Sequence, residues 1–201
     1  MNLQQLTKEI INLQKKSEDW HAPINKVIQE TFEKVNLNGY TWSDHEREVE
    51  EAYRKQLALY NFRQTAFPVR EALLSFYETA TDEDRAEVRR LIWSQSYIPR
   101  LLISYIYQCA ECLESPEDSW ILRSGLVAAA MENYAWGDFR DTDAALVELG
   151  SAAINAGIDI EPIAREVTPL CSPHKPGYMG TRRIIEDFQA FAKQAAANRV
   201  E

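Results

Sequence analysis

Apolar side chains recur every three or four residues along most of the chain, which is the spacing of one face of an α-helix. The clearest stretch covers residues 98–113, with Ile98, Leu101, Leu102, Tyr105, Ile106, Cys109, Cys112 and Leu113 at helical positions. No stretch alternates apolar and polar residues as a half-buried strand does. The pattern therefore predicts an all-α fold of about ten helices.

Capping residues predict where these helices begin and end. Proline is tolerated in the first helical turn, and Ser, Thr and Asp accept hydrogen bonds from the free N–H groups there. The expected starts are Pro23, Ser43 with Glu46, Pro68, Thr81 with Asp84, Ser115 with Pro116, Asp141 or Thr142, and Asp159 or Glu161 with Pro162. Gly157 followed by the apolar Ile158 predicts a Schellman ending.

We expect one helical domain over residues 1–201, with a sub-boundary near residues 65–68 between an N-terminal hairpin region and a C-terminal body. The predicted starts at Thr81, Ser115 and Asp159 are spaced like the repeats of stacked αα-hairpins. The sequence predicts either a short HEAT-like solenoid of such hairpins or an irregular helical bundle.

The formal net charge of −9 disfavours nucleic-acid binding, because an acidic chain repels phosphate backbones. Arg85, Arg89, Arg90 and Arg100 could still form a local basic patch, and ordinary exposed helix faces are the alternative. We expect no membrane span and no secretory signal, because the apolar stretches are short and the N-terminus is polar. Three cysteines are too few for a disulfide framework and are typical of a cytoplasmic protein.

The most specific chemical pattern is the combination of Cys109-x-x-Cys112 with Cys171-x-x-His174. Three thiolates and one imidazole form the ligand set of a structural zinc site. Against that reading, Cys109 and Cys112 lie on an apolar helix stripe, where cysteine behaves as a small hydrophobe. A redox dithiol is disfavoured, because the pair lies at the end of its helix, where the dipole raises the pKa of a thiol. We therefore expect no metal or other cofactor, and keep zinc as an alternative.

No catalytic motif is present. The sequence contains no G-x-S-x-G elbow, no P-loop and no G-x-G-x-x-G loop. Glu18-x-x-His21 matches half of a di-iron ligand set, but no second such pair exists. The sequence therefore favours a protein that is not an enzyme.

The loop after residue 133 combines large aromatic residues with alternating charges, which are the residue types of interface hot spots. The candidate interaction surface comprises Trp136, Asp138, Arg140, Asp141, Arg182 and Arg183. The alternative is that the aromatic residues of this loop fill the core. We expect a cytoplasmic protein-binding module, of a scaffold or immunity type, whose acidic surface suits a basic protein partner. A zinc-stabilised or small-molecule-binding helical protein is the alternative function.

Residues 119–191 contain the segments LRSGLVAAAMENYAWGDFRDTDAALVELGSAAINAGIDIEPI and GTRRIIEDF. An Arg, a D-x-R-D-T segment and an A-G-I-D segment precede a terminal helix ending in Phe. This order resembles a group of bacterial all-helical proteins with no assigned activity. The resemblance implies a bacterial, cytosolic, helical protein. It implies no catalytic residue, and it favours Asp138, Arg140 and Asp141 as part of a recurrent structural turn.

Overall fold

The computed structural model describes residues 1–37, 39–132, 140–171, 188–190, 193 and 197, and the side chains of residues 140 and 141 are not described. These residues form an all-α fold, as the periodicity predicts, and no strand occurs among them. The elements are α1 (Leu3–Val35), α2 (Trp42–Leu59), α3 (Phe62–Thr79), α4 (Asp82–Ser94), α5 (Tyr97–Glu111), η1 (Pro116–Asp118), α6 (Ser119–Met131), α7 (Arg140–Asn155), α8 (Ile160–Val167) and η2 (Thr168–Leu170), where η marks a short 3₁₀ helix.

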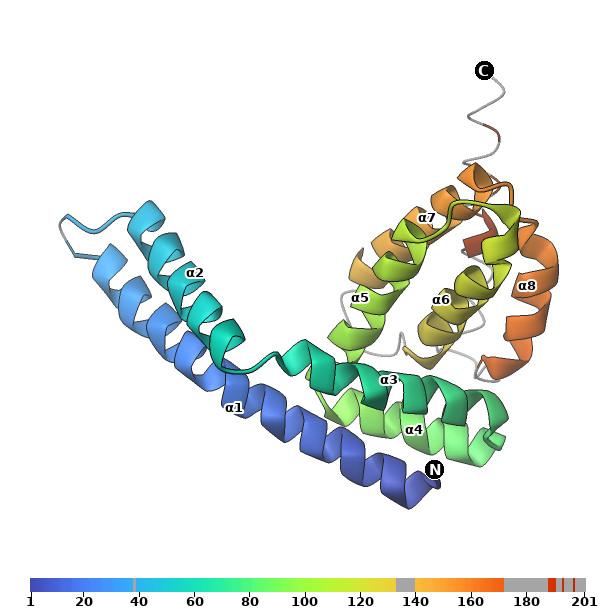
Figure 1. Ribbon diagram of the computed structural model, residues 1–201, viewed down its shortest axis with the longest axis horizontal. Coiled ribbons are helices and arrows are strands. Elements are labelled where there is room, and N and C mark those ends of the chain that lie inside the picture. Colours follow the sequence, from blue (N-terminus) through green and yellow to red (C-terminus); the bar gives the residue numbers. More distant parts are fainter. Residues whose placement is uncertain (38, 133–139, 172–187, 191–192, 194–196, 198–201) are drawn as a thin grey trace, which may run out of the picture.

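Two regions differ in shape (Figure 1). The second half of α1 and all of α2 form an antiparallel helical hairpin that projects from the molecule, which we call the arm (residues 22–59). The first half of α1 packs against α3, α4 and α5, and α5 packs in turn against α6 and α7. We call residues 62–171 the body. The unbroken helix α1 therefore runs from the surface of the body to the end of the arm.

The body contains most of the buried apolar side chains. Leu6, Ile10 and Leu13 of α1, which recur at helical spacing, are buried against it. Helix α6 is surrounded by other elements, and every residue from Gly125 to Met131 is buried. A side chain at Gly125 would meet Leu149 at 3.1 Å. Glycine at this position therefore allows α6 to lie close to α7.

Tyr77 links four elements of the body. Its buried hydroxyl lies 3.2 Å from the carbonyl oxygen of Ala130 and 3.0 Å from that of Leu170, and it accepts a hydrogen bond from Arg89. Helices α3, α4 and α6 and the end of η2 thus meet at one side chain. Arg89 of α4 is itself buried, and Arg90 of the same helix pairs with Glu87. The arginines of α4 therefore do not form the open basic patch that the sequence allowed.

Several predicted caps are confirmed. Thr81 accepts a hydrogen bond from the backbone N–H of Asp84, Ser115 forms a capping box with Asp118, and Asp159 caps α8. Gly157 has a φ of 73°, and the N–H of Ile158 donates to the carbonyl of Ala153 at 3.0 Å. These two features form the predicted Schellman ending.

Other predicted starts are wrong. Pro23 lies inside α1 and Pro68 inside α3, so neither proline opens a helix. The residue that caps α2 is Thr41, which lies two residues before the predicted Ser43. Its side chain accepts a hydrogen bond from the N–H of Asp44. Helix α7 already begins at Arg140, so neither Asp141 nor Thr142 caps it.

The predicted sub-boundary at residues 65–68 falls inside α3. Helices begin close to the three predicted repeat starts, at Asp82, Pro116 and Ile160. A solenoid or bundle assignment stays a prediction. Within the described part of the chain, no helix has the length and apolar character needed to cross a membrane.

Candidate functional site

The structure separates the cysteines of the predicted zinc set. Cys109 is buried in the middle of the body, Cys112 is exposed at the end of α5, and Cys171 is partly buried after η2. Among the described residues, no three His, Cys, Asp or Glu side chains come together to hold a metal ion. His174 lies outside the described residues. The three thiols therefore do not form a common ligand cluster.

Burial also decides the chemistry of Cys109. Loss of water around the side chain raises the pKa of the Cys109 thiol to about 12, although its hydrogen bond to Tyr105 acts in the opposite direction. The reactive form of cysteine is the thiolate, so a thiol that stays protonated at neutral pH is a poor nucleophile. Cys109 packs as a small apolar residue beside Gly125.

Most residues of the predicted interaction surface lie outside the part of the chain that the structure describes. Trp136, Asp138, Arg182 and Arg183 lie outside the described residues. Arg140 and Asp141 form the first turn of α7, and their side chains are not described. This surface therefore stays a prediction.

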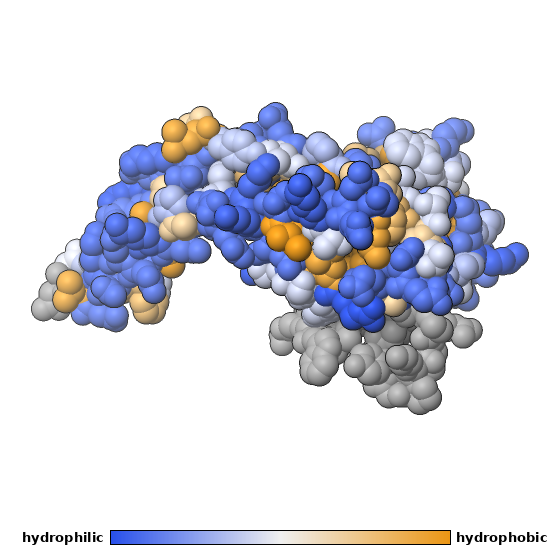
Figure 2. Space-filling view, turned by 90° about the horizontal axis from the view of Figure 1, so that it is seen from below, coloured by the Kyte–Doolittle hydropathy of each residue, from blue (hydrophilic) through white to orange (hydrophobic). Residues whose placement is uncertain are grey.

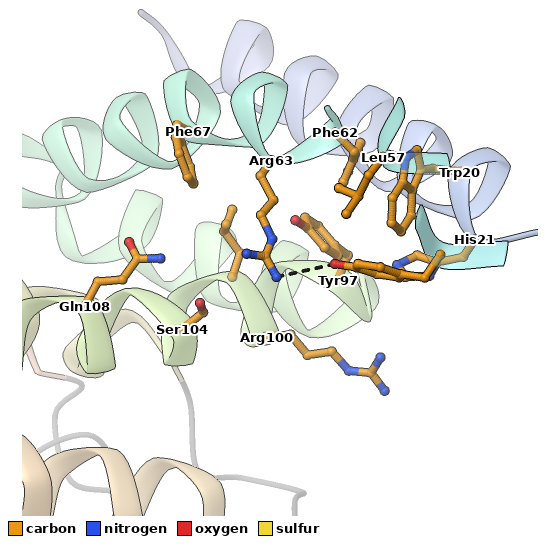
Figure 3. Close-up of a pocket in the computed structure, with 12 residues that line it drawn as sticks. Trp20, His21, Leu57, Phe62, Arg63, Phe67, Tyr97, Arg100, Ser104 and Gln108 are labelled. Carbon is orange, nitrogen blue, oxygen red and sulfur yellow. Dashed lines mark hydrogen bonds between the residues drawn. The ribbon is translucent and has the colours of Figure 1, made fainter. Parts of the chain in front are cut away.

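A cleft of about 230 Å³ lies where the arm meets the body (Figure 3). Four helices contribute to it, because α1 and α2 bring the base of the arm against α3 and α5 of the body. The lining residues are Trp20, His21, Tyr53, Leu57, Phe62, Arg63, Phe67, Tyr97, Arg100, Leu101, Ser104 and Gln108. The set combines aromatic rings, two arginines and small polar groups, and it contains no carboxylate.

The aromatic residues form one connected wall. The ring of Trp20 meets Tyr53 edge to face at a centroid distance of 5.3 Å and stacks at 6.2 Å on Phe62. Phe62 in turn contacts Tyr97 at 4.8 Å. The indole N–H of Trp20 donates to the backbone carbonyl of Tyr60 at 3.0 Å. This hydrogen bond fixes the orientation of the indole, so the wall is formed before any ligand arrives.

The two charged side chains of the cleft, Arg63 and Arg100, are both cations. Figure 3 shows Arg63 reaching from α3 into the space above α5, and Arg100 on the opposite helix. Arg63 donates to the hydroxyl of Tyr53 at 3.5 Å, and neither arginine forms an ion pair with another described residue. Burial and the positive charge of Arg100 lower the pKa of His21, so this imidazole is neutral at pH 7.

The far end of the arm carries a second unusual feature, an exposed apolar cluster. Phe32, Leu37 and Trp42 are 52%, 65% and 58% exposed. The rings of Phe32 and Trp42 meet at 5.9 Å, and His45 lies edge to face with Trp42 at 5.6 Å. Figure 2 shows small hydrophobic areas near the free end of an otherwise hydrophilic arm. We call Phe32, Leu37 and Trp42 the tip cluster.

Sequence analysis missed most of the cleft. Its residues come from four helices, and no motif spacing connects positions as distant as Trp20 and Gln108. Three of its residues stand out in the sequence for other reasons: His21 as half of a di-iron pair, Arg100 as part of a basic patch and Leu101 as part of an apolar helix stripe. The sequence feature that could have indicated the cleft is the number of aromatic residues among its lining positions, such as Trp20 and Tyr53. Helical periodicity alone assigns these aromatic residues to the core.

Comparison with protein-family models, curated proteins and solved structures finds no significant match to this chain.

Proposed function

We propose that this chain is a non-enzymatic protein-binding module, of the scaffold or immunity type, and that its arm is the docking element. The observation that carries the proposal is the tip cluster. Phe32, Leu37 and Trp42 remain exposed, whereas in the described part of the body Trp120 is the one Phe, Leu or Trp side chain that is exposed. Large aromatic side chains dominate the binding energy of protein interfaces, and isolated hairpins gain nothing from exposing them.

The partner is expected to present an amphipathic helix with basic flanks. Acidic residues surround the apolar positions of the arm, and Glu33 and Glu46 form no ion pair with a described residue. The nearby hydroxyl of Tyr40 and the ammonium of Lys34, which lies 3.4 Å from the carboxylate, lower the pKa of Glu48, so this carboxylate is ionised at neutral pH. A helix with lysine or arginine beside its apolar face complements both the charge and the exposed rings.

A shallow hollow on the arm supports the same partner. It has a volume of about 380 Å³ and lies between the two arm helices, where Pro23, Val27 and Ala52 form its floor. Glu48, Glu51 and Lys55 also line it, and the ammonium groups of Lys34 and Lys55 pair with Glu48 and Glu51 at 3.4 Å and 2.8 Å. An apolar floor between two helices favours a third helix as its occupant.

Site-specific photocrosslinking in cells of the source organism tests the proposal. A benzoylphenylalanine replaces Leu37 in the arm or, as the matched control, Trp120 in the body, which is 66% exposed against 65% for Leu37. We expect a discrete crosslinked protein from position 37 and none from position 120. The crosslinked protein should place a basic helix at the crosslink.

Binding of that purified partner to the full chain completes the test. Trp42→Ser should weaken binding at least tenfold, whereas Trp120→Ser should leave it unchanged. Affinity should also fall as salt rises, since attraction between unlike surface charges is screened. Equal adducts from both positions, or wild-type affinity in the Trp42→Ser variant, would contradict docking through the arm.

A further inference from the structure

The tip cluster and the cleft at the base of the arm match each other in size and chemistry. Phe32 and Trp42 of the tip cluster present rings that are 52% and 58% exposed. The cleft presents an aromatic wall, and its volume of about 230 Å³ is below the roughly 300–1,000 Å³ of sites that hold drug-sized ligands. Such a cleft has room for one large side chain. Aromatic side chains that fill a pocket contribute much of the binding energy of protein interfaces.

The tip of the arm also carries an acidic side chain without a partner. Both cations between residues 32 and 48 are already paired, in the ion pairs Lys34–Glu48 and Arg47–Asp44. Glu46 is exposed and forms no ion pair with a described residue. It follows Trp42 by four residues in α2, and side chains at this spacing are neighbours on one helix face. The exposed ring and the unpaired carboxylate therefore share one face of α2.

The mouth of the cleft carries the opposite charge. Arg63 and Arg100 are exposed, and neither forms an ion pair with another residue that the structure describes. Figure 3 shows Arg63 reaching into the cleft, whereas the guanidinium of Arg100 points away from that space. Arg100 can therefore meet a carboxylate that stays outside the cleft while the ring beside it enters. Trp42 and Glu46 offer this combination of ring and acid.

A second copy of the chain can supply the tip for this cleft. A tip cannot reach the cleft of its own arm, because α1 runs without a break between them and extends about 18 Å from Trp20 to Phe32. Two arms that lie side by side in opposite directions bring each tip to the other copy's cleft. A two-fold axis creates both contacts at once, so such an assembly closes as a dimer.

The formal net charge of −9 limits how two copies can associate. Two acidic chains repel each other at long range, and at physiological salt this repulsion is screened beyond about 8 Å. Association then depends on local contacts between apolar surfaces and unlike charges. The symmetric arrangement provides the contact between Glu46 and Arg100 twice.

We propose that two copies of this chain form a reciprocal dimer, in which Trp42 of each copy enters the cleft of the other and Glu46 pairs with Arg100. The proposal rests on the proposed role of the tip cluster as the docking element. It adds that a second copy competes with the protein partner for this cluster. The cleft at the base of the arm is then the surface on this chain that receives the tip.

Sedimentation equilibrium of the purified full chain, over a concentration series at physiological salt, tests the dimer. We expect the mean mass to rise from one chain towards two and no further. Trp42→Ser should weaken dimerisation at least tenfold, because it removes both anchors of the symmetric pair. Trp120→Ser, which removes a ring of the body that is 66% exposed, is the matched control and should dimerise like the wild type.

Charge reversal tests the contact between Glu46 and Arg100. Glu46→Arg or Arg100→Glu alone places two pairs of like charges in the dimer and should weaken it at least tenfold. An equimolar mixture of the two variants restores unlike charges at both contacts, so the mixture should dimerise like the wild type. Misfolded variants would not recover on mixing. Arg90→Glu and Glu148→Arg, exposed positions outside both surfaces, are the controls and should dimerise without mixing.

Three results would overturn the reciprocal dimer. They are a chain that stays monomeric throughout the series, a mass that rises past two chains, and a mixture of the reversed variants that stays monomeric. None of them bears on docking of a protein partner, which the crosslink from position 37 tests separately. In that experiment a second copy would give an adduct of twice the mass of this chain, so the two occupants of the tip cluster are distinguished.

Discussion

The arm and the body have similar helical periodicity, yet they use it differently. In the body, Leu102, Ile106 and Leu126 are completely buried. In the described residues of the arm, only Ile24 and Thr31 are buried, and α2 has no buried residue at all. Phe32 follows Ile24 at helical spacing on α1 but is 52% exposed, against 5% for Ile24.

The difference shows that an amphipathic pattern identifies a helix face that can be covered, and not what covers it. A two-helix hairpin covers one side of each helix, whereas the helices of the body have neighbours on several sides. The apolar residues left over in the arm are therefore available to a ligand or a partner.

Truncating the core should destabilise the protein far more than truncating the arm. Leu102→Ala or Ile106→Ala removes a fully buried side chain and should lower the free energy of unfolding by about 2–5 kcal/mol. Leu59→Ala in α2 removes a side chain that is 79% exposed and should cost less than about 0.5 kcal/mol. Urea denaturation followed by circular dichroism measures both. Similar costs in the two regions would abolish the contrast.

Glu132 should make the stability of the body depend on pH. It is buried beside Thr142, which donates a hydrogen bond to it at 3.0 Å, and burial raises its pKa from 4.5 to about 7. Because the folded state holds this proton more tightly than the unfolded state, the stabilisation is complete below pH 4.5 and is lost as pH rises through 7. The loss amounts to roughly 3 kcal/mol.

Denaturation of the wild type and of Glu132→Gln at several pH values isolates this contribution. The variant cannot ionise at this position, so its stability should fall less between pH 4.5 and pH 8. Glu87→Gln, which changes an exposed acid on α4, is the control and should keep the wild-type slope. Parallel pH profiles for wild type and Glu132→Gln would show that Glu132 keeps an ordinary pKa.

Polar substitutions in the tip cluster should have the smallest effect on folding. Phe32→Ser and Trp42→Ser remove exposed rings that contact one another and the ring of His45, so each should cost less than about 1 kcal/mol. Thermal unfolding followed by circular dichroism measures the change. A cost of 3 kcal/mol or more would mean that the tip cluster belongs to the folding core of the arm.

Local chemistry made part of the fold predictable. The cap at Thr81 and the ending at Gly157 each depend on a few adjacent residues, and both are confirmed. The prolines mislead for the same local reason. Pro23 and Pro68 are exposed, as are residues 19 and 64, whose carbonyls lose a helical hydrogen bond. Water can satisfy these carbonyls, so the helix continues through each proline, and this depends on tertiary exposure that the sequence does not display.

The candidate sites depend on the arrangement of helices to a much greater degree. Arg63 and Arg100 line one cleft only because α3 and α5 lie on two sides of it. The exposure of Trp42 follows from the absence of a third helix beside the arm, among the described residues. Neither fact has a local signature, because both arise from contacts between residues far apart in the chain.

The position of Pro23 in α1 has a mechanical consequence. The proline lacks the N–H that would bind the carbonyl of residue 19, so the helix is least braced where the arm leaves the body. From there to Val35 the helix extends about 18 Å. A bend of about 10° at this point displaces the far end by roughly 3 Å, which is close to the diameter of a water molecule. The cleft beside His21 adjoins this pivot, and the far end of the arm, which a bend at Pro23 displaces, carries Trp42.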